Sequence, residues 1–234
     1  MFMPIKHKKP WVLGLTGPSG SGKSTVCSLL RDAKYSKGAL RFIDADLISR
    51  QVVEPGSPCL DNLVCTFGKE ILLPNGTLDR RKLGNMVFGN PQQIEKLNQT
   101  ILPYILAEIQ NRINAYALED GVKGIILDAP TLFESGADKM CSCTASILAP
   151  RGIRVQRICA RDGISEEAAI KRIDSQHTDD YYKRQSDFVL VNGTRKDNLK
   201  MEVQRMAFWL GLLPAQDFRS SPRRRRKFSD IKRG

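Results

Sequence analysis

Short apolar runs alternate with amphipathic segments along most of the chain. Continuous apolar runs bounded by turn residues are typical of strands that are buried on both faces of a sheet. Five such runs lie at 11–15, 41–43, 124–128, 145–148 and 188–191. Segments of helical periodicity separate them, and this alternation favours parallel strands with right-handed helical crossovers. The pattern therefore predicts an α/β protein with a parallel five-stranded sheet in a three-layer α/β/α arrangement.

Helix-start signals refine this outline near the strands. A helix is predicted over 23–33 after the first run, and another over 47–53 after the second. Two more are expected over roughly 151–160 and 165–175, the latter with Ser165 as its N-cap. Thr194 is placed to cap a last helix that reaches about residue 211.

The longest interval without a strand, residues 58–119, has a mainly helical pattern. Asp79 is expected to cap a helix that runs through Phe88. Pro91 begins the next helix, and Pro103 fits the first turn of one more, since proline is favoured at that position. Because this block lies between two predicted strands, it indicates a helical insertion and not an independent second domain.

The net charge of +12 suggests nucleic acid or an anionic membrane as a partner. The charge is concentrated at the ends, however: residues 1–10 carry +3 and residues 219–234 carry +7. The body, residues 11–218, is left with only +2. Net charge therefore explains nothing that the body does, and nucleic acid is not expected as an obligatory partner.

Cysteine spacing and hydropathy indicate the cellular compartment of the protein. None of the six cysteines forms a C-x-x-C pair, which argues against a zinc site of the usual spacing. No leader-like pattern opens the chain, and no apolar run approaches the roughly 20 residues that span a bilayer. We expect a soluble cytoplasmic protein without a transmembrane segment, whose thiols are reduced.

A glycine-rich motif follows the first predicted strand and precedes a helix. It matches G-x-x-x-x-G-K-[ST] and consists of Gly17, Pro18, Ser19, Gly20, Ser21, Gly22, Lys23 and Ser24. Small residues allow backbone N–H groups to surround phosphate oxygens, and the helix that follows adds its N-terminal dipole. Lys23 is expected to reach the β- and γ-phosphates, and the Ser24 hydroxyl is expected to hold Mg²⁺.

The motif alone leaves the reaction open. It would suit a guanylate-type kinase, another nucleoside or nucleotide kinase, or a transporter ATPase, although no Leu-Ser-Gly-Gly-Gln signature is present for the transporter. A nucleic-acid-associated ATPase is the alternative that the basic tail suggests. The non-functional alternative is that the motif is only a flexible glycine turn. The strand predicted before it and the helix predicted after it argue against this alternative.

Two carboxylates, Asp44 and Asp46, lie just past the second strand. If this stretch is extended, both side chains point to the same side. They would then face the crevice at the carboxyl ends of the strands, where open α/β sheets bind ligands. One carboxylate could orient or deprotonate an attacking hydroxyl. The alternative is that Asp46 simply caps the helix that begins at Leu47.

The chain as a whole resembles the dephospho-CoA kinase family. The resemblance covers roughly residues 11–212 and includes the Gly-Ser-Gly-Lys-Ser-Thr-Val segment at 20–26. The further matching segments lie at 43–58, 78–83, 127–136, 156–163 and 172–176. The stretch 43–58, Ile-Asp-Ala-Asp-Leu-Ile-Ser-Arg-Gln-Val-Val-Glu-Pro-Gly-Ser-Pro, is far more specific than the glycine loop.

The resemblance implies transfer of the ATP γ-phosphoryl group to the ribose 3′-hydroxyl of dephospho-CoA, the last step of coenzyme A biosynthesis, with ATP and Mg²⁺. It also implies a P-loop NTPase core with a helical CoA domain and a mobile lid. The expected core comprises 11–57, 120–150 and 186–212, the CoA-binding insertion 58–119, and the lid 151–185. A basic extension, 1–10, precedes this body, and a basic, disordered tail, 213–234, follows it.

The resemblance also implies roles for individual residues. Asp46 matches the proposed catalytic base, and Lys23 and Arg161 complete the catalytic set. ATP contacts are expected from residues 17–25, including Thr25, and from Arg157 and Arg161 on the lid. Contacts with dephospho-CoA are expected from Asp44, Asp46, Arg50, Arg81, Asp128 and Phe133. The alternatives are a solvated helix face for the lid arginines, surface charge for Arg81 and an ordinary strand-end residue for Asp128.

Some positions depart from the family pattern. Pro18-Ser19 replaces the usual Gly-Ile of the loop, and Leu102 replaces a histidine before Pro103. Pro18 has no N–H, so one backbone donor of the loop is missing. The tail has no implied role: its charge suits weak contact with an anionic surface such as RNA or membrane, or solubility alone.

Overall fold

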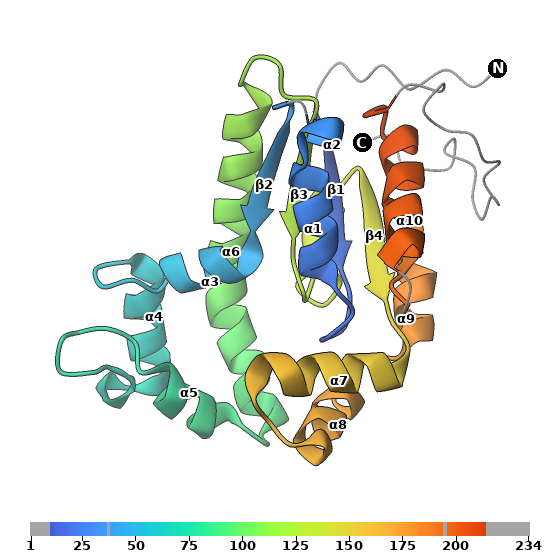
Figure 1. Cartoon of the computed structure of the whole chain (residues 1–234). Coiled ribbons are helices and arrows are strands. Elements are labelled where there is room, and N and C mark those ends of the chain that lie inside the picture. The colour runs from blue at the N-terminus through green and yellow to red at the C-terminus, as the bar shows by residue number, and fades with distance from the viewer. Residues whose placement is uncertain (1–9, 37, 194–195, 214–234) are drawn as a thin grey trace. The chain divides into compact units, whose positions relative to one another are not determined.

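The computed structural model describes residues 10–36, 38–193 and 196–213, and the chain divides into two compact units (Figure 1). Unit 1 comprises Met1–Ile43 and Tyr116–Gly234, and unit 2 comprises Asp44–Ala115. The extension 1–10 apart from Pro10, the cap expected at Thr194 and the tail apart from Leu213 lie outside the described residues.

A five-stranded sheet in the order β2-β3-β1-β4-β5 confirms the predicted fold class. The strands are β1 Trp11–Thr16, β2 Leu40–Asp44, β3 Gly124–Asp128, β4 Cys143–Leu148 and β5 Phe188–Val191. Strand β1 pairs in parallel with both β3 and β4, and β4 pairs in parallel with β5. All five predicted strands are present, and three of them extend beyond the predicted ends by one or two residues.

Packing explains why the central strands are apolar throughout. Every residue of β1 and β4 is buried. Helices α1 (Lys23–Arg31) and α10 (Lys196–Trp209) cover one face of the sheet, where their apolar residues join those of β1 and β4 in one core (Figure 1). Two short elements also belong to this unit: α2 (Ala33–Ser36) follows α1, and the 3₁₀ turn η2 (Ala137–Met140) precedes β4.

The strand order places the glycine loop where a ligand site is expected. From β1 the chain passes to β2 on one side of the sheet, and β4 and β5 lie on the other side. Strand β1, between β3 and β4, is therefore the point at which the direction of winding reverses. Open α/β sheets bind ligands outside the carboxyl ends of the strands at such a switch point. The loop 17–22 follows β1 directly.

Three helices lie between β4 and β5. They are α7 (Arg151–Asp162), α8 (Glu166–Asp174) and α9 (Asp179–Gln185). The Ser165 hydroxyl caps α8 by accepting the Ala168 N–H, as predicted. Helix α9 was not predicted, although Thr178 caps it and acidic residues occupy its first turn. Those two signals would have been sufficient to find it.

Unit 2 is helical around its own apolar cluster. Its elements are α3 (Ala45–Gln51), α4 (Pro58–Phe67), the 3₁₀ turn η1 (Lys69–Ile71), α5 (Arg80–Val87) and most of α6 (Pro91–Ala117). Buried side chains from α4, η1 and α5 form the centre of the cluster. Asp79 caps α5 through the Lys82 N–H, as predicted. The domain boundaries drawn from the sequence stay a prediction.

The expectation that Pro103 begins a new helix is wrong, because α6 is continuous from Pro91 to Ala117 with Pro103 inside it. Proline costs a helix interior one hydrogen bond and a steric clash with the preceding turn. Here Leu97, Ile101 and Tyr104, on both sides of the proline, pack against the apolar cluster of unit 2. Tertiary packing therefore outweighs the local preference.

No helix among the described residues is both long and apolar enough to cross a membrane.

We predict that Pro103→Ala increases the free energy of unfolding by about 1–3 kcal/mol. The Pro103 side chain is exposed, so little packing is lost, and the new N–H can bond to the Gln99 carbonyl. Urea denaturation followed by circular dichroism measures the change. Ala107→Pro, at an exposed site of the same helix, is the reciprocal control and should destabilise by about 3 kcal/mol. A Pro103→Ala protein less stable than the parent chain would contradict this account.

Candidate active site

The glycine loop passes so close to its surroundings that side chains are excluded at key positions. A Cβ on Gly17, where φ is +145°, would lie 2.3 Å from the Ile147 carbonyl of β4. A Cβ on Gly22, where φ is +95°, would lie 2.0 Å from the Asn192 amide nitrogen. Both positions also have a backbone conformation that favours glycine. The loop is thus a bare-backbone turn, the form that a phosphate cradle requires.

Arg157 and Asn192 hold two consecutive carbonyls of the loop. Arg157 Nη1 donates to the carbonyls of Gly20 (3.2 Å) and Ser21 (3.3 Å). Asn192 Nδ2 donates to the Ser21 carbonyl at 2.8 Å. Arg157 Nη2 reaches the Asn192 side-chain oxygen at 3.3 Å, so the two side chains also bond to each other. Arg157 therefore binds backbone carbonyls of the glycine loop, and its contact with ATP stays a prediction.

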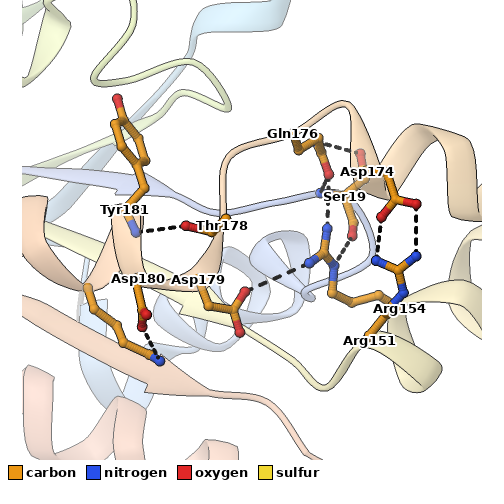
Figure 2. Close-up of polar contacts among 10 residues, drawn as sticks. Ser19, Arg151, Arg154, Asp174, Gln176, Thr178, Asp179, Asp180 and Tyr181 are labelled. Atoms are coloured by element: carbon orange, nitrogen blue, oxygen red, sulfur yellow. Dashed lines mark hydrogen bonds and ion pairs between the residues drawn. The ribbon is translucent and has the colours of Figure 1, made fainter.

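Arg154 and Gln176 hold Ser19 in the same way (Figure 2). Arg154 Nε donates to the Ser19 carbonyl at 3.0 Å. The Ser19 N–H donates to Gln176 Oε1, also at 3.0 Å. Arg154 Nη2 donates to that same Gln176 oxygen at 3.0 Å. Two side chains from the α7–α9 segment thus fix both backbone polar groups of one loop residue.

These contacts set the direction of the N–H groups. In a trans peptide the carbonyl of one residue points opposite to the N–H of the next, and no described peptide bond is cis. Because the Ser19 and Ser21 carbonyls point toward α7 and Asn192, the N–H groups of Gly20 and Gly22 point away from them. The Ser21 N–H is already used, since it donates to the Pro18 carbonyl at 3.1 Å.

The loop ends at Lys23, whose ammonium group pairs with Asp128 at the end of β3. The thiol of Cys27, one turn along α1, donates to the other oxygen of Asp128 at 3.3 Å. Burial raises the pKa of Cys27 to about 12, and the Asp128 carboxylate adds to this rise. The structure therefore brings together Lys23 and Asp128 and makes Cys27 a neutral hydrogen-bond donor.

The residues present fit a nucleotide phosphate with its magnesium ion. Ser24 and Thr25 are exposed in the first turn of α1, at the positive end of the helix dipole. The Ser21 hydroxyl is buried without a hydrogen-bond partner, so a polar group at this loop is left unsatisfied. Among the described residues no group of three or more His, Cys, Asp or Glu could hold a metal by itself. A cation here would thus depend on Ser24 and on phosphate oxygens.

Arg161, the second arginine expected on the lid, does not contact the glycine loop. Its guanidinium donates to both carboxylate oxygens of Asp162, at 2.7 and 2.9 Å. Arg172 of α8 pairs with the same carboxylate. The Arg161 side chain is 60% exposed. Arg157 and Arg161 are therefore one helical turn apart but have different partners. Arg157 binds the glycine loop, and Arg161 binds Asp162 at the end of α7.

Phe133 belongs to a small aromatic group next to α9. Its ring meets that of Tyr181 edge to face, with centroids 6.1 Å apart. The imidazole ring of His177 stacks on the Tyr181 ring, with centroids 3.9 Å apart. Its Nε2 lies 3.4 Å from Glu134 Oε1. His177 is thus a partly exposed histidine with an aromatic and an acidic neighbour.

In unit 2 the expected extended arrangement of Asp44 and Asp46 is wrong. Strand β2 ends at Asp44, whose side chain accepts the Leu47 N–H at 3.0 Å, and α3 begins at Ala45. The cap is therefore Asp44, so the alternative that Asp46 merely caps this helix is also wrong. Asp46 lies in the first turn of α3 and is exposed.

The other residues expected to bind dephospho-CoA are arginines of unit 2. Arg50, in the last turn of α3, and Arg81, in α5, are both exposed. The neighbouring Arg80 donates to the Arg50 carbonyl at 3.4 Å, which connects α5 to α3. Their roles toward a substrate stay predictions.

Three residues that hold the loop were missed by sequence reasoning: Arg154, Gln176 and Asn192. Asn192 was findable, because it directly follows β5 at the carboxyl edge of the sheet, where ligand sites gather. Gln176 lay inside a segment used only for family resemblance. Arg154 had no local signal, since its role depends on a contact with a residue 135 positions away.

Comparison with known proteins gives a consistent result. The family model described as dephospho-CoA kinase matches residues 11–197. The dephospho-CoA kinase of Enterococcus faecalis is 36% identical over 199 residues, which are 85% of this chain and 95% of that protein. The dephospho-CoA kinase of Oryza sativa is 35% identical over 193 residues, which are 82% of this chain and 81% of that protein.

Solved structures agree with these sequence matches. A crystal structure from Thermus thermophilus superposes with a TM-score of 0.69 and 29% identity, covering 85% of this chain and 95% of that one. The dephospho-CoA kinase of Campylobacter jejuni gives a TM-score of 0.60 and 26% identity, covering 83% and 94%.

The arginine contacts at the end of α7 predict an unusual titration. Hydrogen bonds from Arg161, and then from Arg172, lower the pKa of Asp162 to about 2 from its ordinary 3.8. Because the folded pKa lies below the unfolded one, this contribution to stability is present above about pH 4 and is lost as the pH falls toward 2. We expect Arg161→Gln to raise the Asp162 pKa toward 3.8, as measured by carboxyl NMR titration.

Two controls accompany that titration. Arg172→Gln should raise the Asp162 pKa less, because Arg161 makes the larger contribution. Lys171→Gln removes a neighbouring charge that pairs with Glu167, and it should leave the Asp162 pKa unchanged. A midpoint that stays near 2 in Arg161→Gln would refute the assignment.

Proposed function

Since this chain belongs to the dephospho-CoA kinase family, we propose that it transfers the γ-phosphoryl group of ATP to the ribose 3′-hydroxyl of dephospho-CoA. The products are coenzyme A and ADP, and the reaction is the last step of coenzyme A biosynthesis. The observation that carries the proposal is the family match over residues 11–197, which includes the glycine loop, both lid arginines and Asp46.

The loop geometry supports ATP as the phosphoryl donor. The N–H groups of Gly20 and Gly22 and those at the start of α1 supply backbone donors for the phosphates. Residues 17–25 form this ATP site, and Arg157 is one of the side chains that hold its backbone. Ser24 is the residue that would hold Mg²⁺, and the cation would offset the negative charge of the phosphates.

Lys23 changes partners in this scheme. Its ammonium group pairs with Asp128 in the structure. When phosphates occupy the loop, Lys23 turns to their oxygens, because a multiply charged phosphate attracts the ammonium group more strongly than one carboxylate does. Asp128 then keeps the Cys27 thiol as a donor to one oxygen, and its carboxylate can orient the water shell of the cation or a substrate hydroxyl.

Asp46 is the residue proposed to act on the dephospho-CoA side of the reaction. Asp46 accepts the proton of the 3′-hydroxyl and holds that oxygen in line with the γ-phosphorus. Asp44 supports it by starting α3 at the residue that precedes Asp46. Arg50 and Arg81 bind substrate phosphates, and Phe133 contacts an apolar part of the substrate. Arg161 turns from Asp162 to the transferring phosphoryl group during the reaction.

A panel of phosphate acceptors tests the proposed function. Purified protein with Mg²⁺ and ATP should release ADP with dephospho-CoA and should not do so with nucleoside monophosphates, nucleosides or single-stranded nucleic acid. ADP release and conversion of dephospho-CoA to coenzyme A are followed by chromatography. Equal ADP release from several nucleoside monophosphates, with none from dephospho-CoA, would identify a different nucleotide kinase. ATP hydrolysis that requires nucleic acid would identify an ATPase.

Replacing the proposed base tests the mechanism. Asp46→Asn should lower kcat by about 10²–10⁴-fold, because an amide cannot accept the hydroxyl proton, while the affinity for ATP stays within twofold. Steady-state kinetics and equilibrium binding of ATP separate the two effects. Asp61→Asn, an exposed carboxylate in the first turn of α4, is the control and should keep full activity. Unchanged turnover in Asp46→Asn would remove Asp46 from the chemistry.

A further inference from the structure

We propose that Arg154 is a positioning residue of this kinase: by holding the Ser19 carbonyl, it aims the Gly20 N–H at a phosphate of ATP. This inference rests on the proposed function and deepens it. Arg154 would touch neither ATP nor dephospho-CoA, and it would act through the loop backbone alone, with Gln176 as its partner (Figure 2).

The burial of Arg154 is the first support. Only 5% of this residue is exposed, and burying a guanidinium is costly unless its donors are satisfied. Its Nε binds the Ser19 carbonyl and its Nη2 binds Gln176 Oε1, both at 3.0 Å, and its Nη1 lies 3.8 Å from Asp179. Burial also lowers the pKa of Arg154, and the Asp179 carboxylate opposes that shift. A charged, buried side chain thus binds the backbone of the glycine loop at Ser19.

The second support is that the backbone itself restrains the peptide plane between Ser19 and Gly20 only weakly. The plane between Ser19 and Gly20 ends at a glycine with φ of +76°, and a glycine has no Cβ to resist rotation of the plane. Rotation of the plane would turn the Gly20 N–H toward α7 and the Ser19 carbonyl toward the phosphates. A carbonyl oxygen that faces a phosphate repels it. The orientation of this one peptide plane therefore decides whether the phosphate meets the Gly20 N–H donor or the Ser19 carbonyl oxygen.

Gln176 fixes the preceding plane. Its Oε1 accepts the Ser19 N–H and an Arg154 N–H at the same time. The Ser19 N–H therefore points away from the phosphates. The same side-chain oxygen of Gln176 holds the Arg154 guanidinium in the orientation in which its Nε donates to the Ser19 carbonyl. Removing either side chain also removes the hydrogen bond that joins it to the other, so their effects should not add.

Arg151 provides a matched control on the same helix. It lies three residues before Arg154 and forms two hydrogen bonds with Asp174, one of them 2.9 Å long (Figure 2). These side chains are 55% and 53% exposed. Arg151→Met therefore removes the same number of donors from α7 without changing a contact to the glycine loop.

The experiment compares Arg154→Met, Gln176→Met, the double variant and Arg151→Met. Arg154→Met should weaken binding of the non-hydrolysable analogue AMP-PNP with Mg²⁺ by about tenfold or more, as for the loss of one charged hydrogen bond. The KM for ATP should rise in parallel, whereas the KM for dephospho-CoA should stay within twofold. The double variant should be no weaker than the worse single variant, and Arg151→Met should match the parent chain.

An NMR signal of the loop separates positioning from simple stabilisation. The Gly20 amide resonance should shift in Arg154→Met and should lose its response to AMP-PNP, whereas it should keep that response in Arg151→Met. Arg154→Lys, which keeps one donor for Ser19, should recover part of both the affinity and the shift. If Arg154→Met does not fold, Arg154→Lys and Gln176→Met give the same readouts.

AMP-PNP affinity equal to that of the parent chain in Arg154→Lys and Gln176→Met, or an unchanged Gly20 resonance, would overturn the inference. A lower kcat with both KM values unchanged would also overturn it, since that result reports only a smaller folded fraction. Because AMP-PNP binding needs no acceptor, these results stand apart from the acceptor panel. Failure to phosphorylate dephospho-CoA would reject the proposed reaction without deciding the role of Arg154.

Discussion

The nucleotide site depends on one constraint: the backbone of residues 17–22 packs directly against β4, α7 and Asn192. Glycine at 17 and 22 permits this approach, since a Cβ at either position would overlap neighbouring atoms. Once the backbone is this close, arginine and amide side chains can bind its carbonyls. The N–H groups on the opposite side then become available together. Burial of the loop thus provides the polar surface that a phosphate requires.

Much of this arrangement could be predicted from the sequence because it follows local rules. Apolar runs predicted all five strands, and the Gly-x-x-x-x-Gly-Lys-Ser motif predicted the position of the loop between β1 and α1. The side chains that hold the loop could not be found in this way. Arg154 lies on a helix with ordinary amphipathic spacing, and only the three-dimensional contact with Ser19 distinguishes it from Arg151.

The incorrect predictions share a physical cause, which is competition between a local preference and a stronger neighbour. Asp44 could have continued β2, but its side chain caps α3 and ends the strand. Asp46 then has a helical conformation, so the two carboxylates do not follow the alternation of a strand. Pro103 could have ended α6, but apolar residues on both sides of it pack into the same cluster. The sequence shows each preference but does not show which one prevails.

The same backbone logic accounts for the unusual Pro18-Ser19 pair. Pro18 lacks an N–H, but its carbonyl still accepts the Ser21 N–H, so the turn closes without a donor at position 18. The Ser19 N–H is taken by Gln176 and contributes nothing to the phosphate side in any case. The N–H groups proposed to meet the phosphates begin at Gly20, beyond both substituted positions. Side chains at 18 and 19 can therefore vary while the cradle stays intact, provided that the Ser19 carbonyl keeps its partner on α7.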